Sequence, residues 1–189
     1  MRPADDEVLH FSEDPTIELF VPHVAVTASE PEAYVWAVDR HQAPSYWFPR
    51  QCPRAMAWVT ERTSDVDRDR IIGAGCGERV HAIEYAWWDA MRNTRLYAYR
   101  VPARLFRPIA APGTAPYAQV AVEPVTPLGP AEPVGDLIEC HAAAGIQLRL
   151  LQNLRPFWAE VITSTVEFSG IRLSNAQPDR NSSAPATAG

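Results

Sequence analysis

The stretch YVWAVDRHQAPSYWFPRQCPRAMAWVT, residues 34–60, places an apolar run, an aromatic cluster and two arginines directly after one another. Residues 35–38 predict a short buried strand, because so brief a run of β-branched and aromatic residues does not sustain a helix. Pro49 excludes Phe48 from the helical region, so the neighbouring rings of residues 46–48 must splay. We expect the rest of the fold to be organised around this stretch.

Two arginines frame the proline-stiffened turn that follows the rings. Arg50 and Arg54 flank Gln-Cys-Pro, and guanidinium groups beside planar rings suit a nucleotide or another planar anion. The alternative is structural, because aromatic residues usually pack in cores and arginines stack on their faces. Cys52 likewise has two interpretations, a thiol whose pKa the arginines lower or a residue simply packed in the turn.

Length and composition are those of an ordinary globular domain. The 189 residues are 47% apolar and 21% charged with a net charge of −6, which argues against general nucleic-acid binding and leaves room for one sizeable core. All basic residues are Arg, so a lysine Schiff base is excluded. The 18 prolines predict fixed turns and short strands rather than long helices.

The cysteines and the chain's amino end indicate a location. Three widely spaced cysteines without a Cys-x-x-Cys pair favour neither a disulfide framework nor a zinc site, and the scattered histidines predict no metal site. The N-terminus is acidic, and no run of about 18 apolar residues occurs. We therefore expect a cytoplasmic protein that contacts no membrane and holds no metal.

Alternating apolar and polar residues predict most of the strands. Besides the central run, strands are predicted at residues 8–11, 55–60, 96–101, 117–122 and 146–151, with an edge strand at 104–109. Residues 61–79 are predicted to be a polar hairpin excursion. The segment after the first strand keeps two interpretations, a short helix capped by Ser12 and stopped by Pro22, or an extended piece over residues 17–21.

The predicted helices are few and short. Val80, Ile83, Trp87 and Met91 have helical spacing, so a helix is predicted over 80–92. A second is predicted over 136–144 and closed by Gly145, and residues 154–174 predict a helix followed by a strand-like piece. The pattern predicts a single α+β domain over residues 1–176 with a bent, mainly antiparallel sheet, then a disordered tail over 177–189.

Two resemblances suggest a function class. Residues 8–60, with His10-Phe11-Ser12 on the first strand, and residues 162–176, ITSTVEFSGIRLSNA, resemble a bacterial family of uncharacterised proteins. A more distant similarity is to the ADP-ribosyltransferase fold, in which a first-strand His-x-Ser/Thr, an aromatic residue on the second strand and a later acid grip NAD. This resemblance implies a split antiparallel sheet and NAD as the cofactor.

Carried over residue by residue, the resemblance implies a set of NAD contacts. His10 and Ser12 would bind the ribose and the nicotinamide amide, and Trp36 or Tyr46 would pack on the nicotinamide ring. Arg50 would contact phosphate, with Arg54 as the second arginine of the same turn.

The acidic residue departs from the pattern of that fold. The strand at 117–122 lies where the catalytic glutamate is expected, yet its central polar residue is Gln119, and the nearest acid is Glu123. A glutamine neither acts as a base nor carries negative charge. Glu123 is therefore the predicted catalytic residue if the protein transfers ADP-ribose.

Three functional hypotheses follow. The first is an NAD-dependent ADP-ribosyltransferase, and the second is a module that binds a nucleotide or ADP-ribose without chemistry. The third is an interaction protein that uses Trp87 and Trp88 as a partner surface, because adjacent helical residues lie about 100° apart and cannot both face the core. The sequence leaves any protein partner unidentified.

Overall fold

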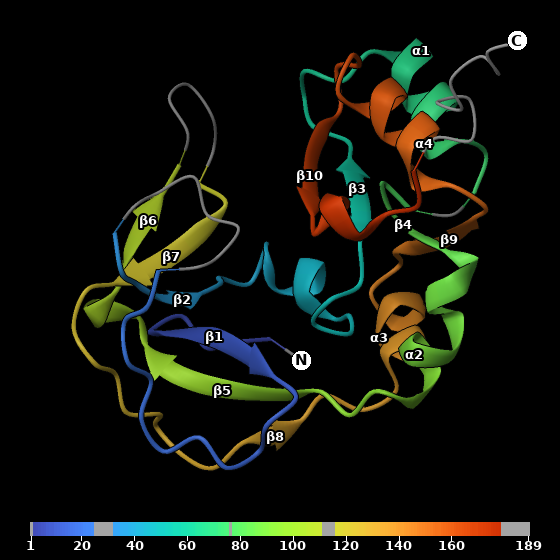
Figure 1. Ribbon diagram of the computed structural model, residues 1–189. Coiled ribbons are helices and arrows are strands. Elements are labelled where there is room, and N and C mark those ends of the chain that lie inside the picture. Colours follow the sequence, from blue (N-terminus) through green and yellow to red (C-terminus); the bar gives the residue numbers. More distant parts are fainter. Residues whose placement is uncertain (1, 25–31, 76, 111–115, 179–189) are drawn as a thin grey trace, which may run out of the picture. The chain divides into compact units, whose positions relative to one another are not determined.

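A computed structural model describes residues 2–24, 32–75, 77–110 and 116–178 of the chain (Figure 1). The chain divides into two compact units. The first unit comprises Met1–Arg50 and Asp89–Ala144, and the second comprises Gln51–Trp88 and Gly145–Gly189. The single domain predicted over residues 1–176 stays a prediction.

The first unit contains two three-stranded antiparallel sheets. One has the order β1-β5-β8 and the other has the order β2-β7-β6. Their bounds are β1 Glu7–Ser12, β5 Tyr97–Pro102, β8 Glu132–Pro133, β2 Val35–Ala37, β7 Ala118–Ala121 and β6 Arg107–Ile109. An isolated bridge between Leu9 and Val38 links β1 to the residue after β2, so both sheets meet at β1 and β2.

A core of apolar residues from both sheets holds the first unit together. It includes Val8 of β1, Val35 of β2, Tyr99 of β5 and Ala121 of β7, and Phe20 from the loop after β1 completes it. The short helices of this unit are η1 Ala43–Tyr46, η4 Ala103–Leu105 and α3 Leu137–Ala143. Asp136 caps α3 by accepting from two backbone N–H groups. Helix α2, Trp88–Asn93, spans the boundary between the units, because Trp88 is assigned to the second unit and the residues from Asp89 onward to the first.

The second unit is a four-stranded sheet covered by a helix. Its order is β10-β3-β4-β9, with β10 Glu167–Ile171, β3 Arg54–Trp58, β4 Arg79–Glu84 and β9 Gln147–Leu151. The pair β4–β9 is parallel, and the other pairs are antiparallel. Helix α4, Leu154–Val161, packs on β3 and β4, as Figure 1 shows in orange.

Smaller helical turns complete the second unit. They are α1 Asp65–Asp67, η2 Arg68–Ile72, η3 Tyr85–Trp87 and η5 Leu173–Asn175. Parallel strands need a long crossover, and here the crossover between β4 and β9 includes residues 89–144, the whole second segment of the first unit.

Most of the predicted elements are confirmed. The α+β class, the strands that became β1, β2, β3, β5, β7 and β9, and the helices α3 and α4 all lie where they were predicted. Residues 61–79 do connect the antiparallel strands β3 and β4, with α1 and η2 inside the connection. Residues 12–21 contain no helix, and Phe20 forms an isolated bridge with Val125, so the extended interpretation of residues 17–21 is confirmed.

The helix predicted over 80–92 is wrong in its first half. Residues Arg79–Glu84 form β4, and only Trp88–Asn93 are α-helical. Strand β4 lies between β3 and β9, and all of its residues after Arg79 are buried. A strand buried on both faces shows no apolar–polar alternation. The apolar residues of 80–92 also happened to fall at helical spacing, so the sequence predicted a helix instead of a strand.

Residues 177 and 178 of the tail predicted over 177–189 lie within the described part of the chain. The backbone N–H of Gln177 donates to the carboxylate of Glu84, and residues 179–189 lie outside the described residues. In the part of the chain that the structure describes, no helix has the length and apolar character needed to cross a membrane.

Candidate functional site

His10 is the chemically most informative residue of the first unit. Its Nδ1 lies 2.7 Å from the backbone oxygen of Trp36, and a carbonyl oxygen only accepts hydrogen bonds. Nδ1 must therefore carry a proton, whatever the charge of the ring. In the neutral ring, Nε2 keeps its lone pair and is a hydrogen-bond acceptor or a base.

The surroundings of His10 keep the ring neutral. Burial is the largest cause that lowers the pKa of His10 below its usual range, while the hydrogen bond to Trp36 acts in the opposite direction. The positive charges of Arg50 and His23 lower this pKa further. The ring packs on Phe20, with 4.3 Å between ring centroids. At neutral pH the imidazole is thus uncharged, with one nitrogen able to accept.

Arg50 brings a positive charge close to His10. Its backbone N–H donates to Glu13 Oε1 at 2.8 Å, which fixes the chain after the aromatic cluster against the loop after β1. The residue is exposed, and its guanidinium has no hydrogen-bond or ion-pair partner among the described residues. The charge of Arg50 lowers the pKa of His10 across forty positions of chain, and the prediction that both residues border one cavity stays a prediction.

Ser12 lies two residues after His10, on the same face of β1. Its buried hydroxyl accepts from the backbone N–H of Asp14 at 3.1 Å. This bond turns the chain away from β1 into the loop that carries Phe20. The hydroxyl proton of Ser12 remains as a donor.

The predicted stacking rings lie elsewhere. The ring of Trp36 meets Tyr34 edge-on, with centroids 5.7 Å apart, and packs in a cluster with Val120. The nitrogen Nε1 of Trp36 is buried without a partner among the described residues. Trp36 therefore reaches His10 through its carbonyl group rather than through its ring.

Tyr46 packs on the opposite face of β1 from His10. It lies against a cluster formed by Leu9, Val38 and Ala43, and Leu9 alternates with His10 along the strand. The next two rings, Trp47 and Phe48, are buried and lie edge-on to His141 of α3. The structural interpretation is therefore confirmed for these two rings.

Arg54 and Cys52 belong to the second unit. Arg54 is buried in β3, and its Nη1 donates to the backbone oxygen of Cys52 at 2.9 Å. Burial raises the pKa of the Cys52 thiol to about 12. The alternative of a lowered thiol pKa is therefore wrong, because loss of hydration outweighs the charge of Arg54.

The predicted acid lies outside the strand. Gln119 is half-buried in β7 opposite Ala37 of β2, whereas Glu123 is exposed in the bend that follows β7. Glu123 precedes Val125 by two residues, and the backbone of Val125 pairs with that of Phe20. A short length of chain thus separates Glu123 from the ring that packs on His10.

The sequence did not predict three residues that affect His10: Glu13, which accepts from the backbone of Arg50, Phe20, which packs on the ring, and His23, whose charge lowers its pKa. Phe20 had a signal, since residues 17–21 are rich in β-branched and aromatic residues and one interpretation made them extended. Glu13 and His23 act through tertiary contacts with no local pattern. No group of three or more His, Cys, Asp or Glu residues among the described positions could hold a metal ion.

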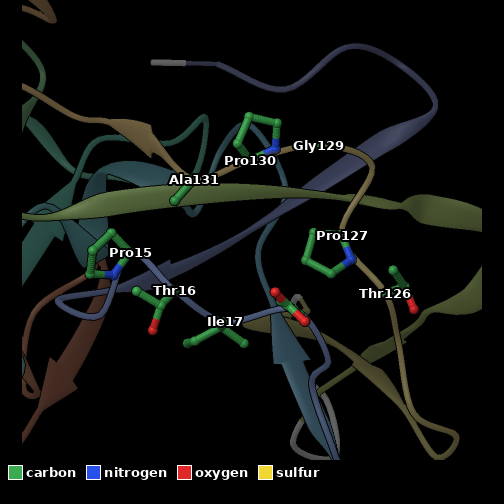
Figure 2. A pocket seen from close by; sticks show the side chains of 9 residues that line it. Pro15, Thr16, Ile17, Thr126, Pro127, Gly129, Pro130 and Ala131 are labelled. Atoms are coloured by element: carbon green, nitrogen blue, oxygen red, sulfur yellow. The ribbon is translucent and has the colours of Figure 1, made fainter.

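A cavity lies between the loop after β1 and the segment that leads to β8. It has a volume of about 520 Å³ and is lined by residues 15–18 and by residues from 126 to 131 (Figure 2). None of the predicted site residues lines this cavity.

These features define a mixed α+β protein whose first unit carries a half-buried histidine with a lowered pKa and an exposed arginine whose charge contributes to that lowering. The chain belongs to the family described as "Family of unknown function (DUF6886)", which matches residues 9–176. The prediction that the chain belongs to an uncharacterised family is thereby confirmed. No curated protein matches the chain, and no solved structure matches it.

Proposed function

We propose that the first unit binds an NAD-type nucleotide beside His10. Nε2 of His10 accepts a hydrogen bond from a ribose hydroxyl, and Arg50 contacts the diphosphate. The observation that carries this proposal is the hydrogen bond of 2.7 Å between His10 Nδ1 and Trp36, which fixes the tautomer of the ring. The alternative is the interaction protein, which uses no small molecule.

The electrostatics support a neutral acceptor beside an anion site. A protonated imidazole donates from both nitrogens and cannot accept from a ribose hydroxyl. The lowered pKa of His10 keeps it neutral, while the guanidinium of Arg50, which has no ion-pair partner among the described residues, suits the two oxygens of a phosphate. Two sheets joined at β1 and β2 also agree with the split sheet that the ADP-ribosyltransferase resemblance implies.

A second candidate function is transfer of ADP-ribose from NAD. The observation that favours it is the position of Glu123, two residues before the Val125 backbone that pairs with Phe20. In this function the Glu123 carboxylate stabilises the positive charge that develops on the ribose as nicotinamide leaves. Gln119, which lies within β7, supplies no such charge.

Binding is tested by calorimetry with NAD and with ADP-ribose. His10→Asn keeps a donor near the Trp36 carbonyl but removes the Nε2 acceptor, so we expect about tenfold weaker binding, the value of one hydrogen bond. Arg50→Ala is expected to weaken binding tenfold or more, because it removes a charge-assisted contact. Arg104→Ala, which changes another exposed arginine of the same unit, is the matched control.

Turnover is tested separately by measuring nicotinamide release and ADP-ribose adducts. Transfer predicts turnover in the wild type and its loss in Glu123→Gln with unchanged NAD affinity. Binding without turnover supports the non-catalytic module. If neither NAD nor ADP-ribose binds, both functions are excluded and the interaction protein remains.

A further inference from the structure

The cavity of the first unit is an open groove between two proline-containing segments. Figure 2 shows Pro15 and Ile17 on one side and Pro127, Pro130 and Ala131 on the other. Its volume of about 520 Å³ lies within the range of small-ligand sites. Most of the lining residues are apolar, and the three prolines have no backbone N–H to donate.

The first wall is held in place from beneath. The hydroxyl of Tyr99 donates to the backbone oxygen of Asp14 at 2.7 Å and accepts from the N–H of Ile17 at 3.0 Å. The carboxylate of Asp14 accepts from both the backbone and the hydroxyl of Thr16. The carboxylate of Asp14 and the hydroxyl of Thr16 are thereby occupied with each other.

The second wall is fixed to β5 and to the core. The N–H of Leu128 donates to the backbone oxygen of Arg100 at 2.9 Å, and Ala131 packs against the core of the unit. Prolines at 127 and 130 restrict the backbone further. Both walls exist before a ligand arrives, so little ordering cost opposes binding.

One charge lies in the groove. Glu18 is the charged residue among those that line it, and its carboxylate has no hydrogen bond or ion pair with any described residue. The remaining polar lining consists of the threonine hydroxyls of Thr16 and Thr126. The charge disfavours anionic ligands and favours a cation that carries an apolar body.

We propose that this groove binds an arginine side chain presented by an extended peptide. The guanidinium forms two parallel hydrogen bonds with Glu18, and the aliphatic stem packs along the proline rings. Arginine fits better than lysine, because its planar group is more weakly hydrated and stacks on flat surfaces. The openness of the groove to solvent suits a side chain from another molecule rather than a buried cofactor.

The proposal is tested without any nucleotide, so its result is independent of the site around His10. A fluorescein-labelled Gly-Ser-Arg-Ser-Gly peptide is titrated with the full chain, and the matched peptide carries citrulline, a neutral analogue of arginine. We expect the arginine peptide to bind about threefold more tightly, which lies within the range of one exposed ion pair. This preference is expected to fall as salt is raised.

Variants locate the site. Glu18→Gln is expected to remove the preference for arginine over citrulline, whereas Glu61→Gln, which removes an exposed carboxylate of the second unit, is expected to keep it. Equal binding of the two peptides by the wild type would overturn the proposal, as would an unchanged preference in Glu18→Gln. The absence of any binding up to millimolar protein would overturn it as well.

Discussion

Tyr99 holds Asp14 through a hydrogen bond of 2.7 Å from its phenolic hydroxyl to the backbone oxygen. The same ring meets Phe20 edge-on at 5.2 Å, and Phe20 in turn packs on His10. One side chain of β5 therefore positions both a wall of the groove and the ring that covers His10. This link makes the loop over residues 13–20 a common element of the two proposed sites.

Removing the hydroxyl in Tyr99→Phe is expected to loosen this loop. The backbone groups of Asp14 and Ile17 lose their partner, which predicts about 1–2 kcal/mol lower stability. Hydrogen exchange at Ile17 should accelerate, since its N–H donates to this hydroxyl. Tyr97→Phe, a change in the same strand, is the control, and equal exchange in the two variants would contradict the assigned role.

His10 predicts a dependence of stability on pH. The folded state lowers its pKa below the usual 6.5, so the unfolded chain binds the proton more readily. The contribution of His10 is complete above the unfolded pKa and is lost as pH falls below about 6.5 toward the folded pKa. Thermal unfolding between pH 8 and pH 5 should show a smaller loss for His10→Asn than for the wild type. Identical losses would show that burial of His10 has no energetic consequence.

Glu84 is expected to anchor the end of the second unit. Its buried carboxylate accepts from the N–H of Leu154, the first residue of α4, at 3.0 Å and from the N–H of Gln177 at 3.0 Å. Glu84→Ala leaves both donors unpaired and should destabilise the protein by about 2–4 kcal/mol in denaturant titrations. Glu78→Ala, which removes only an exposed ion pair with Arg68 at 3.8 Å, should cost less than about 1 kcal/mol.

Gly170 predicts a packing constraint in β10. A Cβ atom at this position would lie 2.8 Å from the ring of Trp158 and 2.6 Å from Leu173, so Gly170→Ala forces side chains to move. We expect a loss of about 1–3 kcal/mol in thermal or denaturant unfolding. Gly129→Ala is the matched control, because nothing lies within 4 Å of its added methyl group. Equal stability of the two variants would show that Trp158 and Leu173 adjust without cost.

The sequence predicted an element correctly where a single local pattern, such as alternation or a terminating glycine, decided its structure. Alternation revealed β5, because one face of the strand packs in the core. Gly145 marked the end of α3, because a residue that takes a φ of 68° after a helix favours glycine. In β4 the same rules failed, because burial on both faces of a central strand hides the alternation.

In the predicted site, too, residue types could be read from the sequence, whereas side-chain orientation could not. Arg50 was predicted from its place after the aromatic cluster and His10 from the ADP-ribosyltransferase resemblance, and in the structure the charge of Arg50 lowers the pKa of His10. The orientation of Trp36 could not be found in this way, because its ring and its carbonyl point to different partners. Arg54 follows Arg50 by four residues, yet the two belong to different units of the chain.

By itself, the amino-acid sequence determined the α+β class, most strands and the positions of α3 and α4, because periodicity and terminating residues are local properties. Only the tertiary structure decided which nitrogen of His10 is protonated, which ring covers it and where the Glu18 groove lies. These features depend on contacts between residues far apart in the chain. Such contacts leave no trace in the spacing of neighbouring residues.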